Sequence, residues 1–192
     1  MKEEVKNGRY VDSIKEKIIK FCRIAMEWNK RKKDKDGTVY WYKDGELHRL
    51  DGPAVEYLDG AKFWCVNGKE HREDGPAIEF ASGTKYWYKD GKRHREDGPA
   101  VEWDNGHREW YKNGQLHRLN GPAVENSDGG KEWWLNGQKH REDGPAIEFA
   151  DGSTLWYLKG VLYTEEEFKK YQLNKKLHQT LEEKPSVKKV KI

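Results

Sequence analysis

Apolar and polar positions alternate along residues 37–163 in short segments, and glycines separate these segments. One kind of segment is aromatic, as in Lys85-Tyr86-Trp87-Tyr88-Lys89, and it ends at an Asp-Gly or Asn-Gly dipeptide. Aromatic residues favour strands, and these dipeptides favour two-residue type I′ hairpin turns. The chain then passes through His-Arg and a Gly-Pro corner into a second apolar piece such as Ala100-Val101-Glu102-Trp103. The pattern predicts a meander of short antiparallel strands.

The whole pattern returns every 23 residues. Six tryptophans and five histidines keep this spacing: Trp41, Trp64, Trp87, Trp110, Trp133, Trp156, His48, His71, His94, His117 and His140. A fixed period of this length is typical of tandem repeats, in which neighbouring copies build one continuous structure. We therefore expect a mainly β fold, an elongated single-layer antiparallel sheet of five hairpin repeats and a partial sixth.

Equivalent residues in such a sheet should recur every ~10 Å, because each copy supplies two principal strands about 4.8 Å apart. Tryptophan rings at that spacing cannot stack directly on one another. We expect the five prolines, which share the period, to lie between them: Pro53, Pro76, Pro99, Pro122 and Pro145.

Helical patterns flank the repeats and would cover their exposed ends. Val11, Ile14, Ile18, Cys22 and Ala25 follow helical spacing, and Thr164-Glu165-Glu166-Glu167 reads as a capping box. The expected organisation is an N-terminal amphipathic helix and basic linker (1–36), the repeats (37–163), a C-terminal helix (164–183) and a flexible basic tail (184–192).

Composition agrees with a repeat array, since 34% of residues are hydrophobic and 37% are charged. The core should be thin and rich in aromatic residues. Net charge is about +5 for residues 1–37, −5 for 38–163 and +3 for 164–192. Cys22 and Cys65 do not form a disulfide framework, and neither a transmembrane segment nor a secretion signal is evident. We expect a cytoplasmic protein.

Repeated histidines beside repeated acids could suggest general acid–base catalysis. An active site is one unique constellation, however, whereas these groups occur five times, so we do not expect an enzyme. Histidines ~10 Å apart cannot share a metal ion, whose nitrogen ligands lie at about 2.0 Å. We expect no metal and no cofactor, and we expect His and Arg to hydrogen-bond the Gly-Pro corner and to pair with nearby acids.

Rows of aromatic and arginine residues also resemble the surfaces that bind single-stranded nucleic acids. The repeats are acidic overall, and each arginine has an acid close by, as in His71-Arg72-Glu73-Asp74. The basic flanks, Lys30 to Lys35 and the lysine-rich tail, remain candidates for phosphate contacts. A nucleotide or nucleic-acid binder is therefore the alternative function.

The segment Tyr88-Lys89-Asp90-Gly91-Lys92-Arg93-His94 and its copy Tyr111-Lys112-Asn113-Gly114-Gln115-Leu116-His117 resemble the centre of a MORN repeat. MORN repeats form successive β-hairpins, and they normally continue as His-Gly-x-Gly. This chain continues as His-Arg-x-Asp/Asn-Gly-Pro-Ala, which is similar to tandem HRxDGPA repeats of phage-encoded and bacterial proteins. The likeness covers Gly37 to about Tyr163 and extends to Gly160–Phe168, where the similar proteins carry Gly-x-x-x-Thr-Glu-Glu-Glu-Phe.

The resemblance implies a non-catalytic protein-binding surface on a phage accessory protein that inhibits a host defence component, in the host cytoplasm. Specificity should lie where copies differ, because the repeated residues serve the fold. The candidate partner-binding residues are Trp103, Trp134, Arg93, His107, Leu47 and Leu116. Exposed strand edges also leave a homodimer open.

Overall fold

Short antiparallel strands dominate the computed structural model, which describes residues 30–182. The expected N-terminal helix and the basic tail lie outside the described residues. The chain divides into two compact units, residues 1–95 and 96–192, and each is treated by itself below.

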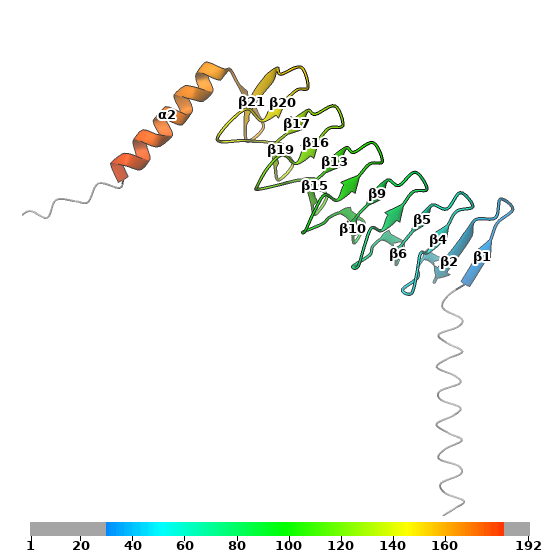
Figure 1. Ribbon diagram of the computed structural model, residues 1–192. Helices are drawn as coiled ribbons and strands as arrows, with labels where there is room; N and C mark the ends of the chain where they lie inside the picture. Colours follow the sequence, from blue (N-terminus) through cyan, green and yellow to red (C-terminus); the bar gives the residue numbers. More distant parts are fainter. Residues whose placement is uncertain (1–29, 183–192) are drawn as a thin grey trace, which may run out of the picture. The chain divides into compact units, whose positions relative to one another are not determined.

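In the first unit, six strands lie side by side in the order β1, β2, β4, β5, β8 and β9 (Figure 1). Their bounds are β1 Lys30–Lys33, β2 Val39–Lys43, β4 Val55–Glu56, β5 Lys62–Phe63, β8 Ile78–Glu79 and β9 Lys85–Tyr86. Small hairpins complete the unit: β3 Glu46–Leu47 pairs with β2, β6 Cys65–Val66 with β7 Lys69–Glu70, and β10 Tyr88–Lys89 with β11 Lys92–Arg93.

The second unit repeats this arrangement, in the order β12, β13, β16, β17, β20, β21 and β22. Their bounds are β12 Val101–Glu102, β13 Arg108–Glu109, β16 Val124–Glu125, β17 Lys131–Glu132, β20 Ile147–Glu148, β21 Thr154–Leu158 and β22 Val161–Tyr163. The hairpins are β14 Tyr111–Lys112 with β15 Gln115–Leu116 and β18 Trp134–Leu135 with β19 Gln138–Lys139, and helix α2 Glu165–Glu182 follows β22.

The small hairpins confirm the prediction drawn from the Asn-Gly and Asp-Gly dipeptides. Asn67 has φ 50° and Gly68 has φ 70°, and the flanking residues Val66 and Lys69 pair directly. Two consecutive positive φ angles define the type I′ turn, whose twist matches that of the flanking strands. Lys159 takes the same conformation at φ 50°, although lysine, unlike asparagine, rarely adopts it.

The strand expected over Lys85–Lys89 is interrupted at its tryptophan. β9 ends at Tyr86 and β10 begins at Tyr88, and the same break separates β5 from β6 at Trp64. The Trp64 amide donates to the Ala77 carbonyl at 2.7 Å. Its own carbonyl accepts from the His71 amide at 3.0 Å, so the chain leaves the sheet here and enters the small hairpin.

Strand register divides the side chains between two faces of each sheet. In the first unit Val55, Phe63, Ile78 and Tyr86 lie directly opposite one another in turn, and Glu56, Lys62, Glu79 and Lys85 do the same. Directly opposed residues share a face, and neighbours along a strand alternate. We call the first the aromatic face and the second the charged face, on which opposite charges alternate across the strands.

The core of each unit is as thin as the composition predicts. Its buried residues are mostly small and aliphatic and come from the Gly-Pro-Ala-Val/Ile segment: Ala54, Val55, Ala77, Ile78, Ala100, Val101, Ala123, Val124, Ala146 and Ile147. The expected richness in aromatic residues is wrong for the buried core, because the repeated tryptophans are only half-buried. Aromatic rings therefore flank the aliphatic core and remain partly open to solvent.

Within the segment expected to be a basic linker, Lys30–Lys33 form the edge strand β1, paired with β2. All four of its residues are exposed, and Arg31 lies 5.9 Å from the Trp41 ring. Charged edge strands hinder pairing with other chains. β1 thus covers one edge of β2 with a strand that is itself strongly basic.

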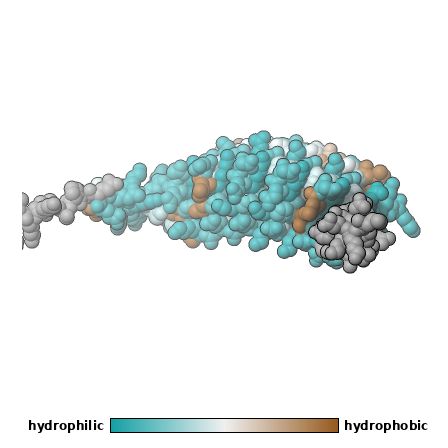
Figure 2. All heavy atoms as spheres, turned by 90° about the horizontal axis from the view of Figure 1, so that it is seen from below, coloured by the Kyte–Doolittle hydropathy of each residue, from teal (hydrophilic) through white to brown (hydrophobic). Residues whose placement is uncertain are grey.

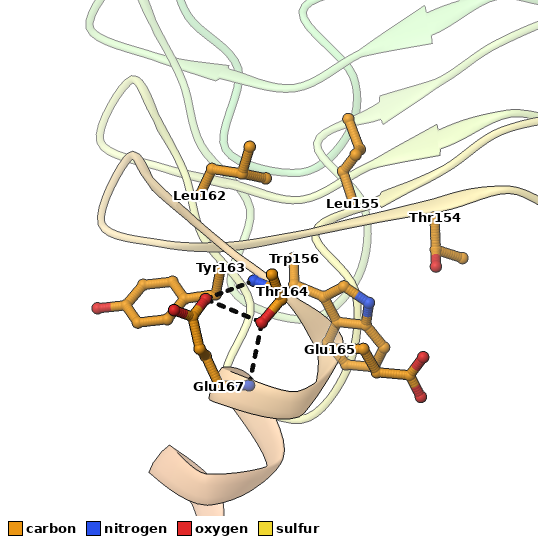
Figure 3. A pocket seen from close by; sticks show the side chains of 8 residues that line it. All are labelled: Thr154, Leu155, Trp156, Leu162, Tyr163, Thr164, Glu165 and Glu167. Carbon is orange, nitrogen blue, oxygen red and sulfur yellow. Dashed lines mark hydrogen bonds between the residues drawn. The ribbon is translucent and has the colours of Figure 1, made fainter.

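Helix α2 begins at the expected capping box (Figure 3). The Thr164 amide and hydroxyl both donate to Glu167 Oε2, at 2.8 and 2.9 Å, and the Glu167 amide donates to Thr164 Oγ1 at 3.2 Å. One turn further on, the fully buried Phe168 ring lies 4.7 Å from Trp156. Gln172 and Lys175 bind the Glu142 carbonyl and carboxylate. The helix therefore packs on the last repeat through one face.

We expect Phe168→Ala to destabilise the last repeat by about 3 kcal/mol, because it removes a fully buried ring from its contact with Trp156. Urea unfolding followed by tryptophan fluorescence measures this loss. Leu177→Ala is the matched control, since Leu177 lies on the same helix but is exposed. Equal losses in the two variants would contradict the capping role of Phe168.

Candidate functional site

An arginine guanidinium stacks on the tryptophan of each complete repeat. The Cζ atom of arginine lies 4.1, 4.0, 4.1, 3.8 and 3.9 Å from the ring centroid in the pairs Arg49–Trp41, Arg72–Trp64, Arg95–Trp87, Arg118–Trp110 and Arg141–Trp133. Each arginine follows its tryptophan by eight residues. Stacking of this kind contributes about 0.5–1 kcal/mol where exposed and more where solvent is excluded.

Each stacked guanidinium is also a hydrogen-bond centre, and Arg72 shows the full set. Nε donates to Asp74 at 2.8 Å, and Nη1 donates to the Pro76 carbonyl at 3.2 Å and to Glu79 at 3.1 Å. A Cβ atom on Gly75 would lie 3.0 Å from the Arg72 Cζ atom. A larger residue here would push the guanidinium aside by a few tenths of an ångström, so glycine leaves it room at the corner.

The prolines contribute to these stacks through their carbonyls. Pro53, Pro76, Pro122 and Pro145 each accept a hydrogen bond from the arginine of their own repeat, at 2.8 to 3.3 Å. The group seen stacked on the tryptophan faces is thus arginine, where the matched periods had suggested proline. The Gly-Pro corner thus positions the arginine through a hydrogen bond, and the arginine stacks on the tryptophan.

The histidines connect each repeat with the next one. The backbone amides of Asn67, Asp90, Asn136 and Lys159 donate to Nδ1 of His48, His71, His117 and His140 at 3.0 to 3.2 Å. At His48 and His71 the same Nδ1 atom also lies 2.9 and 3.0 Å from the side-chain oxygen of Asn67 and Asp90. The donor is the left-handed first residue of the hairpin turn in the following repeat, so histidine fixes that turn in place.

Two acids of the corner titrate below their ordinary range. The hydrogen bond from Arg49 lowers the pKa of Asp51, and the hydrogen bond from Arg72 lowers the pKa of Asp74. Both carboxylates are largely exposed, so the ion pairs they make are screened by solvent. A groove of about 630 Å³ lies between these two corners, and its walls include Arg49, Trp64, His71 and Arg72.

The repeated histidines and arginines are thus engaged in contacts that build the array. Among residues 30–182, no group of three or more His, Cys, Asp or Glu residues is placed to hold a metal ion. Cys65 is buried, and burial, together with the nearby Glu70 charge, raises the pKa of its thiol to about 11. A thiol in this state is a poor nucleophile at neutral pH.

A row of partly exposed rings crosses the aromatic face of the first unit. The ring centroids of Tyr57 and Phe63 lie 5.3 Å apart, those of Phe63 and Phe80 5.8 Å, and those of Phe80 and Tyr86 5.4 Å, all with edge-to-face geometry. We call these four residues the aromatic strip. Tyr57 is 41% and Phe80 36% exposed, although edge-to-face contacts favour burial of aromatic rings.

The second unit has a different chemistry on the equivalent face. Glu109 and Glu132 stand in β13 and β17 where β5 and β9 carry Phe63 and Tyr86. Glu109 lies 3.0 Å from His107 Nε2, and Glu132 accepts a hydrogen bond from Trp134 Nε1 at 3.0 Å. The aromatic strip is therefore a local feature of the first unit, although the backbone repeats in both.

The six residues predicted to bind a partner fall into two groups. Four lie in the small hairpins, where Leu47 pairs with Tyr42, Arg93 with Tyr88, Leu116 with Tyr111 and Trp134 with Lys139. These four are half-buried. Trp103 and His107 form the second group, at the turn between β12 and β13, with ring centroids 6.3 Å apart.

Trp103 was chosen as a residue that breaks the repeat pattern, but it follows the pattern. Its position, directly after the Val-Glu or Ile-Glu dipeptide, also holds Tyr57, Phe80 and Phe149, and only Asn126 departs from it. All four aromatic residues are exposed. The strip was missed because its rings come from two positions of the repeat, and only the strand register shows that these positions share a face.

Elsewhere the surface is mainly hydrophilic, with a few separate hydrophobic patches on the face drawn in Figure 2. Of the helical residues that are described, none lie in a segment with the length and apolar character needed to span a bilayer.

Comparisons with known proteins add no further assignment. The chain matches no protein-family model, and no curated protein matches it. The candidate site therefore stands on its geometry.

We expect Arg72→Ala to lower the free energy of unfolding by about 2 kcal/mol, because it removes hydrogen bonds to two carboxylates and one carbonyl. Arg72→Lys should recover less than half of this loss, since an ammonium cannot replace the planar fork. Thermal unfolding monitored by circular dichroism gives both values, with Lys92→Ala on an exposed strand as the control. If Arg72→Ala left the free energy of unfolding unchanged, the repeated arginines would not stabilise the fold and would become candidates for a binding role.

Cys65 should resist alkylation in the native protein at pH 8, because its raised pKa keeps the thiol protonated. The unfolded thiol ionises near its ordinary value of 9.0, so native stability should fall as pH rises from about 9 toward 11. Iodoacetamide labelling of a Cys22→Ser variant, with and without denaturant, measures the protection. Equal labelling rates in the two states would contradict it.

Proposed function

We propose that the chain is a non-catalytic scaffold that binds a protein partner through the aromatic strip of its first unit. One observation carries the proposal: Tyr57, Phe63, Phe80 and Tyr86 form a continuous row of rings in edge-to-face contact, in which Tyr57 and Phe80 are exposed. Arg93 of β11 lies beside this row, 5.5 Å from the centroid of the Tyr86 ring. Aromatic residues are enriched at the surfaces through which proteins bind one another.

The arrangement of the other side chains supports a binding role over a catalytic one. The His, Arg and Glu residues that could carry chemistry recur in each copy and are held in contacts within and between repeats. The ring positions, in contrast, change from copy to copy, as Phe63, Glu109 and Glu132 show. Variation at an exposed position suits recognition of one particular partner.

The likeness to HRxDGPA repeats of phage-encoded proteins extends the proposal to a biological role. We place the chain with small accessory proteins that act in the host cytoplasm by binding, and so blocking, a component of host defence. A rigid sheet with preformed exposed rings suits this role, because it loses little conformational entropy on binding.

A second candidate is a nucleotide or nucleic-acid binder, and one observation favours it. Lys30 lies directly opposite Tyr42, and Lys32 directly opposite Tyr40, so basic and aromatic groups share a face. The rings of Tyr40 and Tyr42 are stacked, with centroids 6.0 Å apart. Binding of this kind would weaken steeply with added salt, whereas binding through the aromatic strip would not.

The immobilised full chain should retain a protein partner in near-equal amount from host extract, and a Phe63→Glu, Phe80→Asn double variant should lose it. Both substitutions copy residues that the array already carries at equivalent positions, Glu109 and Asn126. Phe149→Asn makes the same change outside the strip and should leave retention intact. Mass spectrometry and absorbance at 260 nm identify the retained material. Retention of nucleic acid would contradict the proposal, and so would equal retention of the partner by the unmodified chain and the double variant.

A further inference from the structure

We infer that the aromatic strip binds a proline-rich segment in the polyproline II conformation, with an acidic residue at the end nearest β1. The inference rests on the proposed function, because it names the kind of partner segment that the same surface holds. It is carried by the period of the strip, by its width and by the charges at its edge.

The spacing of the rings matches the polyproline II helix. Phe63 and Tyr86 lie on β5 and β9, two strand spacings apart, and Tyr57 and Phe80 stand in the same relation. At about 4.8 Å per strand this gives a period of ~9.6 Å. A polyproline II helix repeats every three residues, at ~9.3 Å. Successive triplets therefore meet equivalent rings with an offset of only ~0.3 Å.

Other extended or helical segments fit less well. Side chains on one side of a β-strand recur every ~6.7 Å, out of step with the rings. An α-helix returns to the same face after seven residues, ~10.5 Å, so its offset grows by ~0.9 Å per repeat. A helix also needs a groove to bury its sides, whereas the strip is a single row of rings in edge-to-face contact.

The width of the strip excludes a large folded surface as its occupant. The strip itself, from β4 to β9, covers three strand spacings, or ~14 Å, and the surface that also includes β2 and the lysines of β1 covers five, or ~24 Å, with the rings in two neighbouring rows of the sheet. The resulting area, roughly 240 Å², is well below the ~800 Å² per partner of a typical stable interface. A single segment of about eight residues, at 3.1 Å each, spans the same length.

Charged side chains flank the strip at both ends. At the β9 end Arg93 lies 5.5 Å from the centroid of the Tyr86 ring, and near the β1 end Asp34 accepts a hydrogen bond from the Tyr40 hydroxyl at 3.0 Å. Lys32 and Lys30 are exposed on β1 and lie opposite Tyr40 and Tyr42, on the face that carries the strip. An acidic residue at the adjacent end of the ligand would meet both ammonium groups. The strip also supplies the phenol hydroxyl of Tyr57, which is the kind of donor that the unpaired carbonyls of a polyproline II segment require.

The test uses the full chain and a fluorescein-labelled peptide that carries two glutamates followed by three Pro-Pro-Leu triplets. Fluorescence anisotropy should show saturable binding in the micromolar range. A peptide with alanine in place of every proline should bind roughly tenfold more weakly, because it must lose more conformational entropy on binding. A peptide with lysines in place of the glutamates should also bind less tightly.

Variants of the protein locate the site. Phe80→Asn and Phe63→Glu should each weaken peptide binding by roughly tenfold, as expected for central aromatic contacts. Phe149→Asn, the same change in the second unit, should leave it within twofold, and melting curves confirm that all three variants are folded. Equal binding of the alanine peptide, or unchanged binding by Phe80→Asn, overturns the inference.

Two further probes separate this inference from the proposed function. An amphipathic helical peptide with leucines at heptad spacing, or an oligothymidine, that binds the strip more tightly than the proline peptide overturns the polyproline II assignment. If the proline peptide fails while a protein from host extract is still lost from the double variant, the binding function stands and only the assignment falls. If the extract protein is unaffected as well, both fall.

Discussion

A single guanidinium in each repeat holds together groups that are far apart in the sequence of that repeat. Arg72 stacks on Trp64, binds the Pro76 carbonyl and pairs with Asp74 and Glu79. Through these contacts one side chain connects the tryptophan strand, the Gly-Pro corner and the following strand. The array buries only a thin aliphatic layer, whereas an ordinary domain has a larger core that fixes the positions of its strands. Here the arginine contacts fix those positions.

The two faces of each sheet have different roles, because the arginine contacts that stabilise the fold lie on one of them. The charged face carries the arginine centres and alternating acidic and basic residues. These positions change little between copies: Glu recurs in every copy, and the position of Lys62 and Lys85 holds Arg108 and Lys131 as well, with Thr154 only in the last. On the aromatic face the buried contacts come from Val55 and Ile78, and the ring positions beside them differ from copy to copy. Phe63 and Glu132 occupy the same place on the same backbone, and the fold accommodates both. Recognition can therefore change while the scaffold stays the same.

Periodicity made the main features of the fold predictable from the sequence. The two-residue turns followed from Asn-Gly and Asp-Gly, and the start of α2 followed from its capping box at Thr164. The break of each strand at tryptophan did not, because it depends on hydrogen bonds to Ala77 and His71, which are distant in the sequence. β1 was also missed, since Lys-Arg-Lys-Lys has no apolar alternation and its pairing with β2 supplies the order.

The candidate site was only partly predictable for a related reason. Variation between copies drew attention to Arg93 and Trp134, which lie in the small hairpins. Tyr57 and Phe63 looked like ordinary strand residues, because each belongs to a different position of the repeat. Their contact exists only after the register places Val55 opposite Phe63. A surface built from two positions of a repeat cannot be found by comparing copies one position at a time.

The replacement of arginine by Phe168 at the last tryptophan has a consequence for how such arrays evolve. Each copy brings its own arginine, and its turn amide meets the histidine of the copy before it, so a duplicated copy arrives with every contact it needs. The final tryptophan, Trp156, has no arginine eight residues after it, and α2 supplies Phe168 in its place. Duplication or deletion of gene segments can thus lengthen or shorten the array by whole copies, while one terminal helix continues to cover its end. The length of the sheet can therefore change while the fold of each repeat stays the same.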